Sequence, residues 1–123
     1  MKSTTKKFIF LLALALPFFG WSQVITNVNT SSQNCQGDTI NVTFAVTSPL
    51  NAGNEFKVEL SDATGAFPGV FIQINPLLGF SVGAYNMDAI IPLTTTQGLY
   101  KMRIIGSNPV IASDTLNNII IGR

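Results

Sequence analysis

Residues Thr39–Val46 read TINVTFAV, in which large apolar side chains alternate with polar or small ones, and this pattern indicates the fold class. Its apolar face holds Ile40, Val42, Phe44 and Val46. A two-residue repeat is the period of a β-strand that buries one face and exposes the other. We therefore expect a strand here with its apolar face toward a core.

The same alternation recurs along the chain. It is clear in Glu55–Asp62, Tyr85–Ile91 and Leu99–Ile105, and weaker in Val24–Asn29, Val70–Asn75 and Leu116–Ile121. In Glu55–Asp62 we expect Lys57, Glu59 and Ser61 to face outward, and in Val70–Asn75 we expect Val70, Ile72 and Ile74 to share the inward face. We expect the end of the last stretch to be buried on both faces. Clusters of Gly, Pro and Asn separate these stretches, and residues 23–123 show no helical stripe. About seven short strands with regular turn signals predict an all-β fold, a two-sheet antiparallel immunoglobulin-like sandwich.

The N-terminus has the features of a secretory signal peptide. Three lysines precede the apolar run Phe8–Phe19, and Gly20-Trp21-Ser22 offers small residues before a cleavage point. The alternative is a membrane anchor, but the run of about 12 residues is short of the roughly 20 that a spanning helix needs. We predict a signal peptide over residues 1–22 and one domain over residues 23–123. The expected location is secreted, extracellular or at the cell surface, with no membrane span after cleavage.

The charged residues argue against two classes of function. Residues 23–123 hold four basic and six acidic side chains, a net charge of −2. No basic patch is present to hold phosphates, so nucleic acid is not an expected partner. The sequence contains no histidine, the residue that most often serves as a general acid or base. We therefore expect neither enzymatic activity nor a cofactor.

Three loop carboxylates raise the question of a calcium site. Asp38, Asp62 and Asp114 carry the oxygen ligands that Ca²⁺ prefers, but no loop has closely spaced carboxylates. We predict that these residues shape turns and that no metal binds. The single cysteine, Cys35, cannot form an internal disulfide. It is either buried, an exposed free thiol, or paired between chains.

Strand pairing gives a further expectation. In an immunoglobulin-like sandwich, the third and sixth strands (Glu55–Asp62 and Leu99–Ile105) are neighbours. Glu59, on the outer face, would then pair with Lys101 or Arg103, for at most about 1 kcal/mol at an exposed site. Tyr100 is either a core aromatic or a tyrosine whose hydroxyl bonds back to the backbone at a strand corner.

Three phenylalanines fall outside the inward-facing pattern. Phe67 lies in a Gly-rich stretch, Phe71 points opposite to Ile72 on its strand, and Phe80 follows a glycine. Such residues either fold back over the edge of the core or gather into a ligand-binding patch. Phe67, Phe71 and Phe80 are therefore the candidate binding residues.

Three segments resemble those of immunoglobulin-like modules in exported Bacteroidetes-type proteins. They are Cys35-Gln36-Gly37-Asp38, the run NAGNEFKVELSDATGAF at 51–67, and the run GLYKMRIIGSNP at 98–109. The resemblance implies a fibronectin III-like or immunoglobulin-like repeat, of the kind found in adhesins and gliding-associated proteins, with no catalytic residues. It also implies that Thr39 and Thr115, each in an Asp-Thr-aliphatic sequence, are acceptors for O-glycosylation.

These observations predict a non-catalytic secreted or cell-surface module with a structural or adhesive role. It is either a free-standing domain or a fragment of a longer multi-module adhesin. Its partners would be an extracellular protein, a glycan or neighbouring modules. The alternative is a dedicated glycan- or protein-binding domain that uses the loop aromatics.

Overall fold

The computed structural model describes residues 24–122, and these residues form strands and no helix. The strands are β1 (Ile25–Asn29), β2 (Gln33–Cys35), β3 (Thr39–Val46), β4 (Glu55–Leu60), β5 (Val70–Phe71), β6 (Leu77–Leu78), β7 (Gly83–Ile90), β8 (Gly98–Ser107), β9 (Val110–Ala112) and β10 (Leu116–Gly122). Within residues 24–122, no helix is long and apolar enough to cross a membrane. The predicted signal peptide, residues 1–22, lies outside the described residues.

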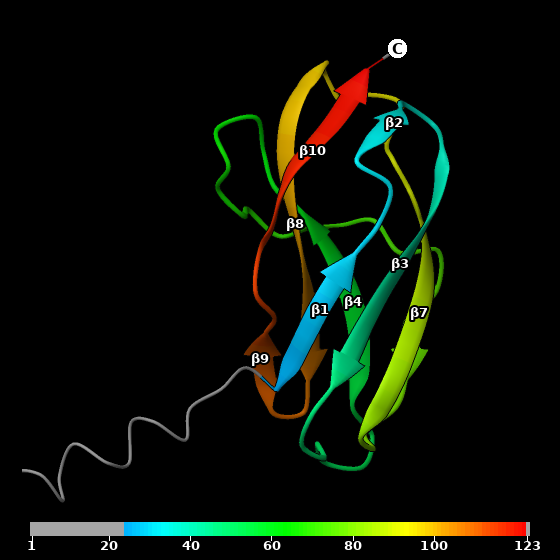
Figure 1. Cartoon of the computed structure of the whole chain (residues 1–123), viewed down its shortest axis with the longest axis vertical. Helices are drawn as coiled ribbons and strands as arrows, with labels where there is room; N and C mark the ends of the chain where they lie inside the picture. Colours follow the sequence, from blue (N-terminus) through cyan, green and yellow to red (C-terminus); the bar gives the residue numbers. More distant parts are fainter. Residues whose placement is uncertain (1–23, 123) are drawn as a thin grey trace, which may run out of the picture.

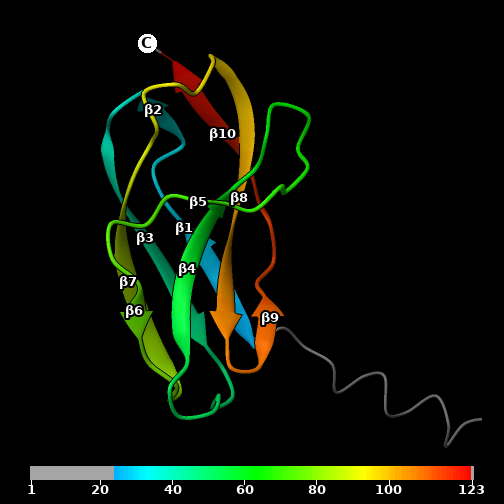
Figure 2. The ribbon, with the colours of Figure 1, turned by 180° about the vertical axis from the view of Figure 1, so that it is seen from behind.

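The strands form two sheets packed face to face (Figures 1 and 2). One sheet has three strands in the order β1-β3-β7; the other has seven, ordered β2-β10-β8-β4-β5, with β6 beside β4 and β9 beside β8. If β1, β3, β4, β7, β8 and β10 take the letters A, B, C, E, F and G, the sheets are A-B-E and C-F-G. That is the immunoglobulin-like arrangement. The predicted fold class is confirmed, and so is the pairing of the third and sixth predicted strands, since β4 pairs with β8.

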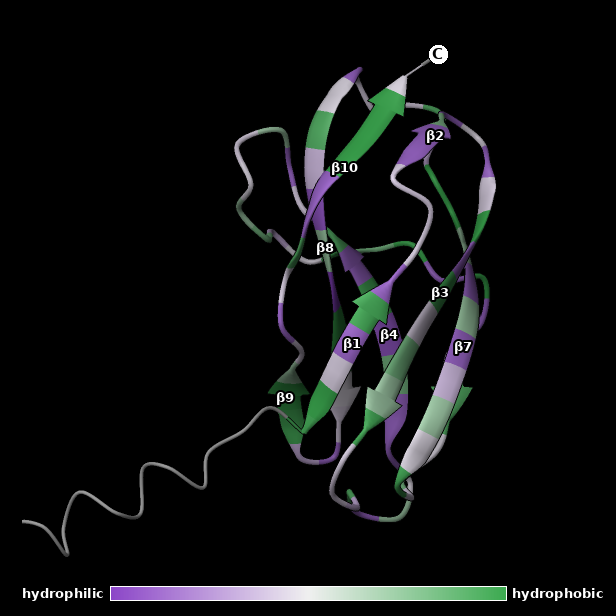
Figure 3. Ribbon diagram, in the orientation of Figure 1, coloured by the Kyte–Doolittle hydropathy of each residue, from purple (hydrophilic) through white to green (hydrophobic). Residues whose placement is uncertain are grey.

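The core lies between the sheets and follows the predicted inward faces. All four apolar residues of the TINVTFAV stretch are buried. At the centre, the ring of Phe44 packs edge-on against Phe56, with centroids 4.9 Å apart, and stacks on Tyr85 at 5.5 Å. Figure 3 shows the alternation of hydrophobic and hydrophilic residues along β1 and β7 that produces this burial. Each apolar side chain removed from water contributes roughly 25 cal/mol per Å² of its apolar surface.

The connection between β4 and β7 differs from the predicted strand at Val70–Asn75. Val70 and Phe71 pair with β4, the Ile72 amide donates to the Val58 carbonyl at 2.9 Å, and Gln73 then bridges to Ala89 of the opposite sheet. Because the chain crosses between sheets, it does not keep one face toward the core. Ile72 is buried as predicted, whereas Val70 and Ile74, predicted inward, are exposed.

Two other expectations about burial were wrong. Glu59 and Ser61, predicted to face solvent, are buried, because the loop that follows β4 folds back over them. Ile120, in the stretch expected to be buried on both faces, is exposed, while Ile119 and Ile121 enter the core. The short strands β2, β6 and β9 were not predicted at all, because two or three residues are too few to show a period.

Candidate functional site

The three candidate aromatics do not form one patch. Phe71 pairs with Glu59 near the end of β4, whereas Phe80 follows Gly79, whose amide donates to the carbonyl of Asn54 at the start of β4. At about 3.3 Å per residue, these two points on β4 lie roughly 16 Å apart. Phe71 lies opposite Glu59, and Phe67 lies over Arg103, the partner of Glu59, whereas Phe80 lies near the start of β4.

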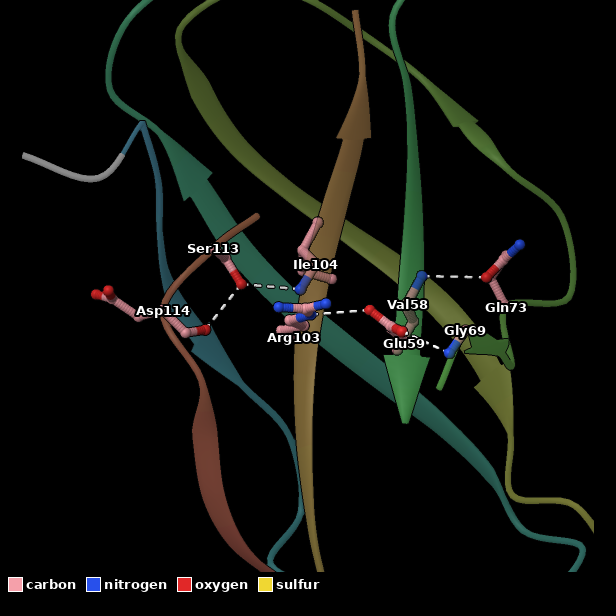
Figure 4. A network of polar contacts seen from close by, with 8 residues as sticks. All are labelled: Val58, Glu59, Gly69, Gln73, Arg103, Ile104, Ser113 and Asp114. Carbon is pink, nitrogen blue, oxygen red and sulfur yellow. Dashed lines mark hydrogen bonds and ion pairs between the residues drawn. The ribbon is translucent and has the colours of Figure 1, made fainter. Parts of the chain in front are cut away.

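Phe67 covers an ion pair on the outer face of the seven-stranded sheet. Arg103 Nε donates to Glu59 Oε1 at 2.8 Å, and the backbone amide of Gly69 donates to Glu59 Oε2 at 2.9 Å (Figure 4). The Phe67 ring centroid lies 4.3 Å from the Arg103 guanidinium carbon. The predicted pairing of Glu59 is thereby confirmed, with Arg103 as its partner. The pair is covered, however, and the Glu59 side chain is only 4% exposed.

The loop of residues 61–69 is anchored at several points. Lys101 N donates to Ser61 Oγ at 2.8 Å. Asp62 Oδ1 accepts from the Thr64 hydroxyl at 2.6 Å and from the amides of Thr64 and Ala66, each at 2.9 Å. The Thr64 hydroxyl, followed by the Ala66 amide, holds the pKa of Asp62 below its usual value. Gly65, at φ +91°, provides the left-handed residue that closes the turn.

The loop carboxylates considered for calcium lie on separate loops. Asp62 caps its own turn, and Asp38 Oδ2 accepts from the amide of Cys35 at 2.7 Å. Asp114 is exposed in the connection before β10. Within residues 24–122, no three His, Cys, Asp or Glu side chains are placed to hold a metal ion together.

The structure rules out one alternative for Cys35 and decides the role of Tyr100. Cys35 is exposed at the end of β2, so burial is wrong, and a free thiol or an interchain pair remains. Tyr100 is both a core aromatic and a corner tyrosine: it is buried, and its hydroxyl donates to the carbonyl of Thr96 at 2.8 Å. Tyr85 repeats the pattern, since its hydroxyl donates to the carbonyl of Ser81 at 2.7 Å. Each hydroxyl thus fixes the chain just before its own strand.

The proposed glycosylation acceptors are both accessible. Thr39 is the first residue of β3, and Thr115 directly precedes β10; both are exposed. Accessibility is what modification requires, and the modification itself stays a prediction.

Asn54 is a buried polar residue that no local sequence pattern singles out. It is 1% exposed. Its Nδ2 donates to the Gly79 carbonyl at 2.8 Å, and its Oδ1 accepts from the amides of Ser107 and Asn108, each at 2.9 Å. One side chain therefore joins the start of β4, the β8–β9 turn and the chain before β7. These three segments are far apart in the sequence, so their proximity is visible only in the folded chain.

Exposed apolar side chains gather on residues 70–82, which we call the apolar flank. Of the eleven large hydrophobic residues that are exposed within residues 24–122, six lie here: Val70, Phe71, Ile74, Leu78, Phe80 and Val82. The surrounding stretch, residues 63–87, contains no charged side chain. A hollow of about 230 Å³ separates the chain at 74–77 from residues 86–88 of β7. Exposed apolar side chains in this number on one uncharged stretch make residues 70–82 the candidate interaction surface.

Comparison with known proteins gives a structural similarity and no family. The chain matches no protein-family model and no curated protein. Among solved structures, it is similar to the CARDB domain of the PF1109 protein in complex with di-metal ions from Pyrococcus furiosus. The TM-score is 0.44 and the identity 10%, over 82% of this chain and 88% of that domain. The assignment of this chain as an immunoglobulin-like sandwich rests on its own strand order.

Proposed function

We propose that this chain is a non-catalytic, secreted or cell-surface immunoglobulin-like module with a structural or adhesive role, and that it contacts other proteins through the apolar flank. The observation that carries this proposal is the gathering of exposed hydrophobic residues on residues 70–82, in a stretch without charge. Apolar side chains stay exposed in this number at a cost in solubility, which protein contact removes.

Export is supported by the signal-peptide features of residues 1–22 and by the resemblance to Bacteroidetes-type exported modules. The proposal holds whether this chain is a free-standing domain or a fragment of a multi-module adhesin. Mass spectrometry of the protein from culture medium and outer surface should find an N-terminus at Gln23. A full-length protein confined to the cytoplasm would contradict export.

The adhesive role can be tested with protein-coated beads on cells of the producing strain. Leu78→Lys places a charge at the most exposed position of the apolar flank, 68% exposed, and should abolish bead attachment. Val110→Lys is the matched control, because Val110 is 81% exposed on β9, outside the flank. Equal attachment of both variants and the unchanged protein would contradict a role for the flank.

A second candidate is a glycan- or protein-binding domain that uses the aromatics. It is favoured by the exposure of Phe71, 45%, and Phe80, 47%. Phe67 contributes less, because its ring covers Arg103. On this alternative, Phe71→Ala abolishes binding on a glycan array while Leu78→Lys leaves it intact; the adhesive proposal predicts no array signal.

We also propose that Thr39 and Thr115 carry O-linked glycans. Both hydroxyls are accessible, and each follows an aspartate and precedes an aliphatic residue. The intact mass of the native protein should exceed the peptide mass by hexose units, and Thr→Ala at either site should remove one increment. An unmodified native mass would contradict the proposal.

A further inference from the structure

Strand β7 has a free edge beside the apolar flank. Its other edge pairs with β3 in unbroken register, from Thr39 opposite Ile90 to Val46 opposite Gly83. On the free edge, the Ile74 amide donates to the Asp88 carbonyl at 3.0 Å, and the Ile90 amide donates to the Ile72 carbonyl at 3.0 Å. Residues 72–74 therefore cover only the last part of β7.

The uncovered part exposes a short row of backbone groups. In an antiparallel strand, alternate residues direct their N–H and C=O groups to the same side. Since Asp88 and Ile90 bond outward, Ala84 and Asn86 direct theirs to the free edge. Within residues 24–122, these groups of Ala84 and Asn86 have no hydrogen-bond partner. β7 has no lysine, proline or bulge to protect this edge, and its one charged residue, Asp88, lies in the part that residues 72–74 cover.

The apolar side chains lie on the same side of the molecule. β6 pairs with β4, so residues 77–78 form the edge of the seven-stranded sheet next to the β7 edge of the other sheet (Figure 2). The large apolar side chains exposed there are Ile74, Leu78, Phe80 and Val82. A strand that paired with β7 would bond to the free backbone groups at the edge of the three-stranded sheet. It would also contact the apolar side chains at the neighbouring edge of the seven-stranded sheet.

We propose that a second copy of this chain binds here, with the two β7 strands antiparallel and Ala84 opposite Asn86 of the second copy. The inference rests on the proposed function, because it names the partner of the apolar flank. A two-fold axis perpendicular to the sheets places β7 against β7 and, in the same operation, one apolar flank against the other. The uncharged stretch of residues 63–87 creates no repulsion between copies and offers nothing for a charged partner to complement.

The first test is the mass of the purified protein over a concentration series by sedimentation. A reversible dimer is expected. Asn86→Pro removes an amide that makes no internal bond and blocks the edge, so it should weaken dimerisation at least about tenfold, as loss of a few hydrogen bonds predicts. Leu78→Lys should do the same, whereas Val110→Lys should not. Far-UV circular dichroism checks that each variant folds.

The second test needs no variant. Amide hydrogen exchange at high and low protein concentration should show that Ala84 and Asn86 become protected only in the dimer. Tyr85 and Met87 are internal controls, because their amides face β3 and stay protected at both concentrations.

A protein that is monomeric at all concentrations overturns the inference, as does a dimer in which Ala84 and Asn86 exchange as fast as in the monomer. If the protein is monomeric and Leu78→Lys still abolishes bead attachment, the proposed function stands and the flank contacts a different protein. If the dimer forms through β7 and Leu78→Lys leaves attachment intact, the inference stands and the adhesive role fails.

Discussion

The 61–69 loop and the apolar flank are consecutive parts of one connection between β4 and β7, yet they use their aromatic residues in opposite ways. In the loop, Phe67 covers Arg103, and the polar groups around it are bonded within the chain. In the flank, Phe80 and Leu78 face solvent. A phenylalanine outside the inward-facing pattern can therefore cover an internal ion pair, as Phe67 does, or stay exposed on an outer surface, as Phe80 does.

The largest effect on stability should come from the residue that holds the flank to the sandwich. Asn54→Ala leaves the Ser107 and Asn108 amides and the Gly79 carbonyl without their partner, which should lower the free energy of unfolding by about 3 kcal/mol. Urea denaturation measures it. The matched control is Asn51→Ala, whose exposed side chain bonds only to the Asn108 side chain and should cost less than about 1 kcal/mol. Equal losses would show that the flank does not depend on Asn54.

Glu59→Ala should lower the free energy of unfolding by about 2 kcal/mol, the next largest loss. The half-buried guanidinium of Arg103 and the Gly69 amide both lose their acceptor in this variant. Arg103 is 30% exposed and can turn toward water, which limits the loss. Glu59→Gln keeps an acceptor for Gly69 and should recover part of the stability. A loss below about 0.5 kcal/mol for Glu59→Ala would mean that the loop is not anchored by the pair.

The aromatic rings give a direct test of the comparison. Phe67→Ala should lower the free energy of unfolding by about 1 kcal/mol, because the ring both packs on the loop and attracts the guanidinium. Phe71→Ala should cost about half as much, since its ring is 45% exposed and lies 5.4 Å from Lys57 Nζ. The reverse order would show that the loop and the flank do not differ as described.

The smallest effect concerns pH. The pKa of Asp62 is lowered in the folded state by the Thr64 hydroxyl and the Ala66 amide. Its contribution to stability is therefore present above its unfolded pKa, about 3.9, and is lost as the pH falls through the lower folded value. NMR titration of the carboxyl should show the low pKa, and Thr64→Val should raise it toward the ordinary value. A pKa that does not change in Thr64→Val would exclude the hydroxyl as the main cause.

Much of the fold could be predicted because the strands TINVTFAV and LYKMRII keep one face toward one core. Alternation is a local property, so the sequence reveals it directly. The pairing of Glu59 with Arg103 followed from the expected strand order, but its burial did not, because that depends on the path of a loop whose polar residues have no period. For the same reason Val70 and Ile74 were placed on the wrong face, where the chain leaves one sheet for the other.

The candidate site was less predictable than the fold. The exposed aromatics were identified as a group, but their division between the 61–69 loop and the apolar flank depends on contacts across the sheet. Asn54 has no local signal, since its three partners lie 25 to 54 residues away along the chain. The free edge of β7 is equally hidden, because an unpaired strand and a paired one have the same alternation.

The parallel pairing of β2 with β10 affects how the domain responds to a pulling force. Val24 and Gly122 lie at opposite ends of the long axis, and β2 runs parallel to β10 (Figure 1). A pull that separated these ends would slide β2 and β10 past each other along their length. The hydrogen bonds between them would then share the load together instead of opening one at a time, which is the arrangement that resists stretching.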